Sequence, residues 1–154
     1  MVGRESYCRC MYYSANALAR NMTRMAEKEF ERTGLAPSLG FVVMTVNKKP
    51  GIAAGDIAHI MQLQASTVTR LVDKLVKSGY LKRKTAGKFV LVVPTPKATR
   101  LNERLVVAWQ ELFKRYTAIL GEEPSNDLTA AMYEASCRLE SGPKTKRDIS
   151  QRSR

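Results

Sequence analysis

The chain has 154 residues, of which 44% are hydrophobic, and it carries a formal net charge of +12. These values suit one globular domain, exclude a chain too polar to fold, and favour a polyanionic partner. Because no stretch reaches the about 20 apolar residues that span a bilayer, and no signal peptide opens the sequence, we expect a cytoplasmic protein.

Cysteine and histidine are too few and too scattered to suggest catalysis or metal binding. The three cysteines are Cys8, Cys10 and Cys137, and the single histidine is His59. An odd number of cysteines is not typical of a disulfide framework, and side chains two residues apart on a helix point about 200° apart. The sequence has no nucleophile motif and no phosphate-binding glycine loop. We therefore expect no enzyme activity, no cofactor and no metal site.

Apolar residues at helical spacing predict two helices at the start of the chain. The first covers residues 5–32, and its apolar stripe is Tyr7, Met11, Ala15, Leu18, Met22, Met25 and Phe30. Gly34 is a stop signal for this helix. Pro37 suits the first turn of a second helix, whose apolar run covers residues 39–46.

A pair of shorter helices follows. The first fits residues 54–61, and after a turn at residues 62–65 the second fits residues 66–78. The second helix is strongly two-sided. Its apolar face is Val68, Leu71, Val72, Leu75 and Val76, and its opposite face is Ser66, Thr67, Arg70, Asp73, Lys74 and Lys77.

Two short strands then fit residues 81–84 and 89–93, with residues 85–88 as a tight hairpin turn. Thr95 and Pro96 begin a long fifth helix that ends near Gly121. A sixth helix starts near Ser125 and is expected to bury Leu128, Ala131, Met132, Ala135 and Leu139. The fold predicted is mainly α with a small β-hairpin wing (α+β).

The order of a short helix, a tight turn, a second helix and a basic hairpin is typical of the winged helix-turn-helix. In this motif the second helix lies in the major groove of DNA, and its first residues contact base edges. Hydroxyls and cations suit base edges and phosphates. The candidate DNA-binding residues are therefore Ser66, Thr67, Thr69, Arg70, Lys74 and Lys77 on the helix and Lys82, Arg83, Lys84 and Lys88 on the hairpin.

The charge distribution agrees with this interpretation. From Gln64 to Arg100 the chain has nine basic residues, and its one acidic residue there is Asp73. The alternative is an ordinary solvated charged surface. A winged-helix module that binds another protein and does not read DNA is the rival function, and such a wing should expose apolar residues where this one presents cations.

Three segments resemble the MarR family of transcriptional regulators. They are Gly-Asp-Ile-Ala-His-Ile-Met at residues 55–61, Ala-Ser-Thr-Val-Thr-Arg-Leu-Val-Asp-Lys-Leu at 65–75, and Gly-Tyr-Leu-Lys-Arg at 79–83. The resemblance implies a homodimeric regulator, most often a repressor, that binds a pseudo-palindromic operator and releases it on binding a small-molecule or oxidant effector. Two departures stand out: the wing lacks the family's Asp-x-Arg motif, and Ala36 precedes Pro37 where the family has a threonine cap.

The resemblance also implies the organisation of the chain. Residues 1–141 form one domain, in which 5–48 and 96–141 are the helical dimerisation region and 52–94 the DNA-binding region. From their polar and basic composition, residues 142–154 are expected to be a disordered tail.

Cys8 and Tyr12 are a candidate redox sensor. Four residues apart near the start of the first predicted helix, they would share one face. This pair resembles the branch of the family that senses organic hydroperoxides through an N-terminal cysteine. The alternative is that the cysteines are small packing residues.

Overall fold

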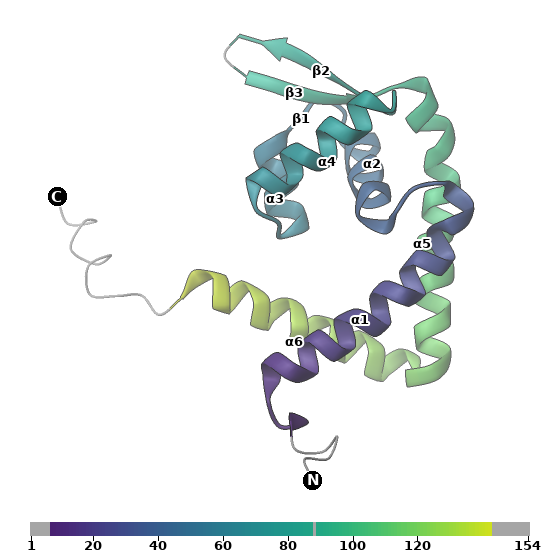
Figure 1. Ribbon diagram of the computed structural model, residues 1–154, viewed down its shortest axis with the longest axis vertical. Coiled ribbons are helices and arrows are strands. Elements are labelled where there is room, and N and C mark those ends of the chain that lie inside the picture. The colour runs from purple at the N-terminus through teal and green to yellow at the C-terminus, as the bar shows by residue number, and fades with distance from the viewer. Residues whose placement is uncertain (1–6, 88, 143–154) are drawn as a thin grey trace, which may run out of the picture. The chain divides into compact units, whose positions relative to one another are not determined.

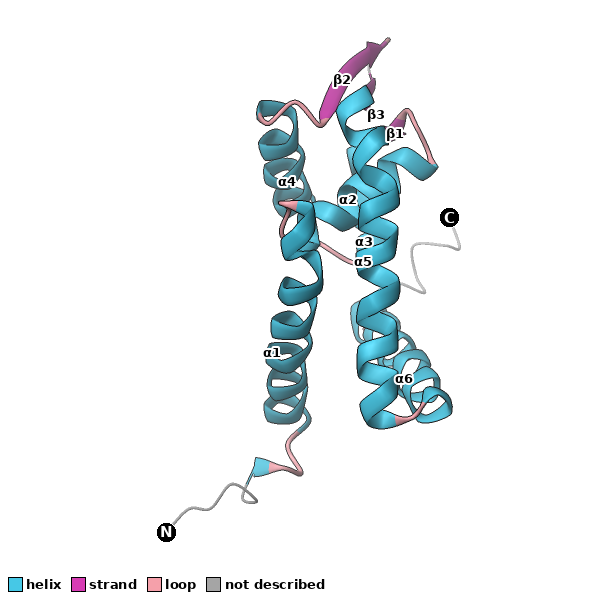
Figure 2. Cartoon of the chain, turned by 90° about the vertical axis from the view of Figure 1, so that its right-hand side faces the viewer, coloured by secondary structure: helices cyan, strands magenta, loops and turns pink. Residues whose placement is uncertain are grey.

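The structure is a computed structural model that describes residues 7–87 and 89–142. Its elements in chain order are α1 (Met11–Phe30), the 3-10 helix η2 (Glu31–Thr33), α2 (Pro37–Lys48), β1 (Ile52–Ala53), α3 (Ala54–Met61), α4 (Ala65–Lys77), β2 (Leu81–Ala86), β3 (Phe89–Pro94), α5 (Pro96–Leu120) and α6 (Glu122–Ser141). Figure 1 shows these elements along the chain. The described part is mostly helical, and its strands are confined to the wing (Figure 2). The predicted fold class is confirmed.

The first helix begins later than predicted. Cys10 has an extended backbone, and residues 7–10 form a turn in which the Cys10 amide donates to the Tyr7 carbonyl at 2.9 Å. The Ser14 hydroxyl donates back to the Cys8 carbonyl at 3.1 Å, which stabilises this turn. The α-helix therefore begins at Met11. Residues 7–10, which were predicted to belong to it, do not.

The last helix begins earlier than predicted. It starts at Glu122 rather than near Ser125, and its first turn carries Glu122 and Glu123, whose charges favour a helix N-terminus. Ser125 is instead a buried residue of this turn, and its hydroxyl donates to the carbonyl of Gly121 at 2.5 Å.

The sheet has one strand more than predicted. β1 pairs antiparallel with β3, with Ile52 opposite Val92, and the strand order is β1-β3-β2. Two residues are too few to show the alternation by which a strand is predicted. The hairpin strands are also longer than predicted, because pairing continues to Ala86 in β2 and to Pro94 in β3.

The chain divides into two compact units, Met1–Leu112 and Phe113–Arg154. The first unit holds the hydrophobic core, which joins the end of α1, helices α2 to α4, the sheet and the first half of α5. Its fully buried large side chains are Phe30, Val42, Val43, Val46, Ile52, Ile57, Val68, Val72, Leu75, Leu81, Val92 and Leu105.

The second unit contains the end of α5 and α6. Phe113 and Tyr116 form an edge-to-face pair with ring centroids 5.5 Å apart. The residues predicted to be buried on α6 are exposed in the single chain, which corrects that expectation: Leu128, Ala131, Met132, Ala135 and Leu139.

No helix among the described residues combines the length and the apolar character needed to cross a membrane.

Gly40 lies at a close contact within the core. A Cβ atom placed on it would lie 2.7 Å from a ring carbon of Phe30 and 3.0 Å from a methyl carbon of Leu105. Close packing of α2 against α1 and α5 therefore requires glycine, which has no Cβ atom, at this position.

We expect Gly40→Ala to destabilise the protein by about 1–3 kcal/mol, because the overpacking cost exceeds the helix propensity gained. Gly55→Ala on α3 is the matched control, since its Cβ would meet open space. This control should leave stability unchanged or raise it by about 0.4–1 kcal/mol. Urea unfolding measures both variants, and equal stability of the two would contradict the packing argument.

Candidate nucleic-acid interface

Helices α3 and α4 form a helix-turn-helix (Figure 1). The turn between them is set by Gln62, which adopts a left-handed backbone conformation with φ of 50°. The amide of Leu63 donates to the carbonyl of Ala58 at 2.9 Å, which closes the end of α3. The chain then enters α4 at Ala65, one residue before the predicted start.

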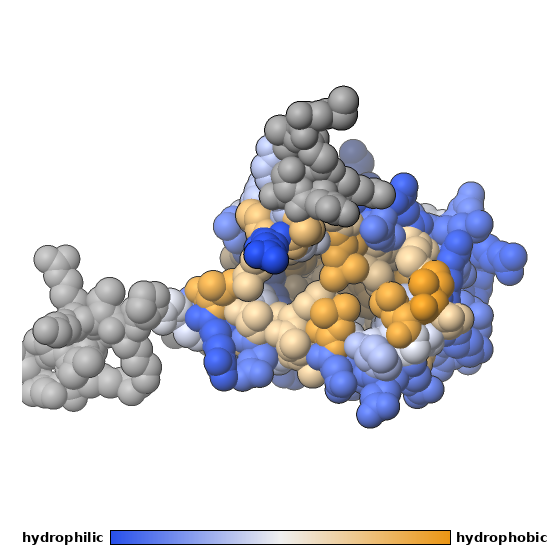
Figure 3. Space-filling model, turned by 90° about the horizontal axis from the view of Figure 1, so that it is seen from below, coloured by the Kyte–Doolittle hydropathy of each residue, from blue (hydrophilic) through white to orange (hydrophobic). Residues whose placement is uncertain are grey.

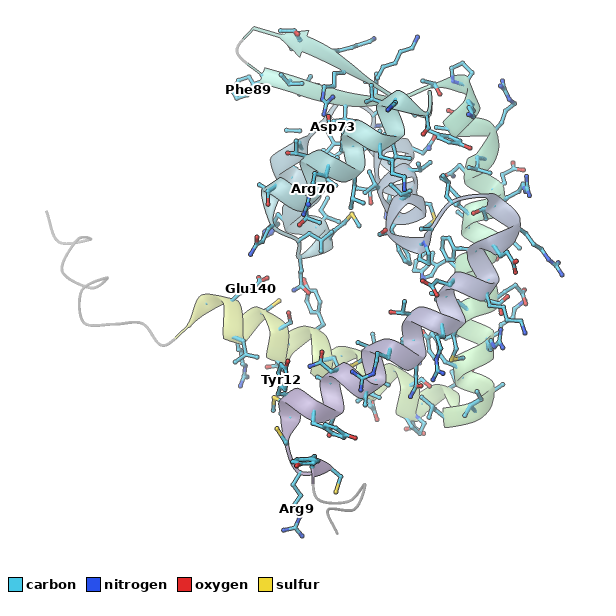
Figure 4. All side chains as sticks on the ribbon, in the orientation of Figure 1. Arg9, Tyr12, Arg70, Asp73, Phe89 and Glu140 are labelled. Atoms are coloured by element: carbon cyan, nitrogen blue, oxygen red, sulfur yellow. The ribbon has the colours of Figure 1, made fainter. Side chains whose placement is uncertain are left out.

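Burial fixes which side of α4 faces the protein. Val68, Val72 and Leu75 are fully buried against the core. The opposite side is exposed, and it carries Ser66, Thr69, Arg70, Asp73, Lys74 and Lys77. Of the other candidate residues, Thr67 is half-buried, and the hydroxyl of Thr69 donates within the helix to the Ala65 carbonyl at 2.9 Å. Figure 4 shows Arg70 and Asp73 on this helix.

The end of α4 is held by the start of α5. The Thr95 hydroxyl donates to the carbonyl of Gly79 at 2.8 Å, and the Thr95 amide donates to the carbonyl of Tyr80 at 2.9 Å. The Lys97 ammonium donates to the carbonyl of Ser78 at 2.9 Å and lies 4.1 Å from the centre of the Tyr80 ring. A cation at a helix C-terminus also complements the helix dipole.

The β2–β3 hairpin lies beside α4. Lys82, Arg83 and Lys84 are exposed, and Arg83 pairs with Asp73 of α4 at 2.5 Å. This ion pair was not predicted, because it joins residues on two different elements. It neutralises the one acidic side chain of the exposed face of α4. Lys88, the remaining hairpin candidate, lies outside the described residues.

The hairpin also exposes apolar side chains, which the sequence analysis did not anticipate. Phe89 is 59% exposed and Val90 is 50% exposed. Exposed cations alone were expected to separate a DNA-binding wing from a protein-binding wing. Because this wing has both, that criterion does not decide between the two functions.

The structure does not bring Cys8 and Tyr12 onto one helix face. Cys8 lies in the turn before α1, and both side chains are exposed. The pairing of a cysteine with a tyrosine occurs instead on α6, where a side-chain hydrogen bond with Cys137 raises the pKa of Tyr133.

A cleft of about 810 Å³ opens in the first unit between α2 and α5. Its apolar wall includes Phe41 and Trp109, whose rings meet edge to face. The complete lining is Phe41, Met44, Thr45, Asn47, Lys48, Lys49, Ile60, Asn102, Val106 and Trp109.

Asn102 is the unusual residue of this cleft. Its side-chain oxygen is buried and accepts no hydrogen bond from any described residue. Buried polar atoms are normally paired, so this acceptor is suited to a donor that enters the cleft. For metals, the described residues contain no group of three or more carboxylate, imidazole and thiol side chains placed to hold an ion.

Comparison with known proteins agrees with this architecture. Residues 35–86, from two residues before α2 to the end of β2, match the sequence model of the MarR family. The chain is 22% identical over 119 residues to the HTH-type transcriptional regulator BilQ of Clostridium symbiosum, which covers 75% of this chain and 83% of BilQ.

Two solved structures share the fold. The PcaV transcriptional regulator of Streptomyces coelicolor, in complex with its natural ligand, has a TM-score of 0.78 at 16% identity and covers 90% of this chain and 99% of its own. The S. aureus MepR–DNA complex has a TM-score of 0.68 at 18% identity and covers 81% of this chain and 93% of its own. The family model matches 52 of the 154 residues, which carry α2, the helix-turn-helix and the first strand of the hairpin, so this part of the chain is similar to the MarR family.

Proposed function

We propose that this protein is a transcriptional regulator that binds double-stranded DNA as a homodimer and releases it on binding a small molecule. The observation that carries the proposal is the orientation of α4: its apolar side is buried, and its exposed side presents hydroxyls and cations beside a basic hairpin. The match of residues 35–86 to the MarR family model and the fold shared with the MepR–DNA complex support it. Most regulators of this kind are repressors, and we propose repression here.

Residues on α4 then divide by position. Ser66, Thr67 and Arg70 lie in the first two turns, where side chains of such helices meet base edges. Lys74 and Lys77 lie further along, where phosphates are within reach. Lys82 and Lys84 extend the cationic surface onto the hairpin.

Arg70→Ala is expected to weaken binding to the operator by about 1–3 kcal/mol and to relax base preference at one position, because it removes a bidentate donor. Lys82→Ala should weaken binding to all duplexes alike and lower the salt slope by about 1. Fluorescence anisotropy over a range of salt concentrations, on an operator obtained by genomic fragment selection, measures both effects. Unchanged operator affinity in folded Arg70→Ala protein would place base readout elsewhere.

The rival function is a wing that binds another protein, and the exposed Phe89 and Val90 favour it. The selection separates the two functions. A DNA-reading dimer enriches an inverted repeat with half-sites about one helical turn apart. Enrichment of no sequence, with only salt-sensitive general binding, would leave the rival function.

Exposed apolar side chains on three helices support the homodimer. Met11 and Tyr12 on α1, Ile119 on α5 and Leu139 on α6 are each more than 70% exposed in the single chain. Figure 3 shows exposed apolar side chains among the polar ones. Large exposed apolar patches mark interfaces. We propose that residues 5–48 and 96–141 supply this interface and that residues 52–94 bind DNA.

Light scattering at micromolar concentration should give about twice the 17.3 kDa mass of one chain. Met132→Glu, which puts a charge on the exposed side of α6, should shift the protein toward monomer. Ala130→Glu is the control, because this exposed residue lies about 200° from Met132 around the same helix. A folded wild-type monomer at this concentration would exclude the homodimer.

The cleft between α2 and α5 is the proposed effector site. Its volume falls within the about 300–1,000 Å³ typical of ligand sites, and its walls are mainly apolar and aromatic. Lys48 and Lys49 add positive charge to its lining. The buried side-chain oxygen of Asn102 has no hydrogen-bond donor among the described residues. These features suit a small aromatic anion that carries a hydroxyl group.

Trp109 is the single tryptophan of the chain and lines this cleft, so its fluorescence reports on binding. We expect 4-hydroxybenzoate to quench Trp109 and to lower operator affinity. Asn102→Ala should weaken binding of 4-hydroxybenzoate about tenfold, since a buried acceptor then no longer meets the hydroxyl, and should leave benzoate binding unchanged. Equal losses for the two acids would remove Asn102 from the recognition of the hydroxyl.

An oxidant is the alternative effector, with Cys8 as its target. The same operator assay tests it by treatment with cumene hydroperoxide, with Cys8→Ser alongside. Loss of operator affinity in the wild type, and its retention in Cys8→Ser, would favour the oxidant over the aromatic anion.

A further inference from the structure

The outer face of the hairpin is half basic and half apolar. Cross-strand partners share a face of a sheet, and Lys82 pairs with Val93, Lys84 with Leu91 and Ala86 with Phe89. The intervening pair, Arg83 with Val92, lies on the opposite face, where Val92 is buried in the core. Lysines on β2 therefore stand beside an apolar row on β3 that ends in the exposed Phe89.

Phe89 lies beyond the supported part of the sheet. β1 pairs only with Leu91 and Val92, so the end of the hairpin has no third strand beside it. Figure 4 shows Phe89 at this far end of the wing. A large aromatic side chain that is 59% exposed at such a position adds little to the core.

The contact between Arg83 and Asp73 fixes where this end lies relative to α4. Ala86, the partner of Phe89, is three residues past Arg83, which places it about 10 Å further along the strand. A duplex with α4 in its major groove therefore meets the wing at the phosphate backbone and, beyond it, at the neighbouring minor groove.

The cation that could enter that groove from the middle of β2 is engaged, because Arg83 is paired with Asp73. The walls of the minor groove are phosphates and largely apolar deoxyribose rings, and its floor is formed by base edges. Proteins that enter it commonly insert phenylalanine and other apolar side chains, with lysine and arginine at the walls. The outer face of this hairpin offers that combination.

We propose that Phe89 enters the minor groove of the operator beside the half-site read by α4, while Lys82 and Lys84 contact the flanking phosphates. This inference rests on the proposed DNA-binding function and adds to it a specificity-determining residue. Because the contact is apolar, it contributes affinity that does not depend on salt. It also makes the minor groove at one flanking step part of the recognised sequence.

The test compares Phe89→Ala with Lys84→Ala on the selected operator. Phe89→Ala should lower affinity about tenfold with an unchanged salt slope, as removal of an apolar contact does. Lys84→Ala should lower the slope by about 1. Phe89→Leu, which keeps an apolar side chain, should retain most of the affinity. Because Phe89 is exposed, urea unfolding should show the same stability for all variants.

A second arm locates the groove. Replacing adenine by 2,6-diaminopurine at one flanking step adds an amino group in the minor groove and leaves the major-groove edge unchanged. This base should weaken the wild type and have no effect on Phe89→Ala. Wild-type affinity in Phe89→Ala, or equal sensitivity of both proteins to diaminopurine at every flanking step, would overturn the inference. Failure of the wild type to bind any specific operator would instead overturn the proposed function.

Discussion

The rest of the site depends on one constraint, which is the side of α4 that faces the core. Val68, Val72 and Leu75 are buried on one side. Each such side chain contributes about 1.5–3 kcal/mol, more than the about 1 kcal/mol of a typical hydrogen bond. Burial therefore determines which residues of α4 face outward. The hydrogen bonds from Thr95 and Lys97 then fix where its last turn lies.

The ion pair between Arg83 and Asp73 matters for geometry more than for stability. Both side chains are more than a third exposed, and exposed pairs typically contribute about 0–1 kcal/mol. Its effect is to hold the hairpin beside α4 and to cancel the one negative charge on that surface. The remaining cations of α4 and β2 then face a polyanion without local competition.

The helix-turn-helix and the exposed side of α4 could be predicted from the sequence, because α3 and α4 are short, strongly periodic helices with clear turn signals. Contacts between residues of different elements were harder to predict. β1 has only two residues, and the Arg83–Asp73 contact joins two elements, so neither leaves a local pattern. Cys8 was misplaced because apolar periodicity extends past the true start of α1. The burial predicted from the apolar stripe of α6 was wrong for the single chain, because an apolar pattern does not show whether a covering surface exists in the same chain.

Helix α5 joins the two proposed sites of the first unit. Its first turn carries Lys97, which with the preceding Thr95 holds the end of α4, and further along it carries Asn102 and Trp109 of the cleft. A shift of α5 against α2 that accommodates a ligand must therefore either carry the end of α4 with it or break three hydrogen bonds, those from the Thr95 amide, the Thr95 hydroxyl and the Lys97 ammonium. At about 1 kcal/mol each, breaking them costs more than a small tilt of an exposed helix end. Movement of α4 together with α5 is thus the less costly response to occupation of the cleft.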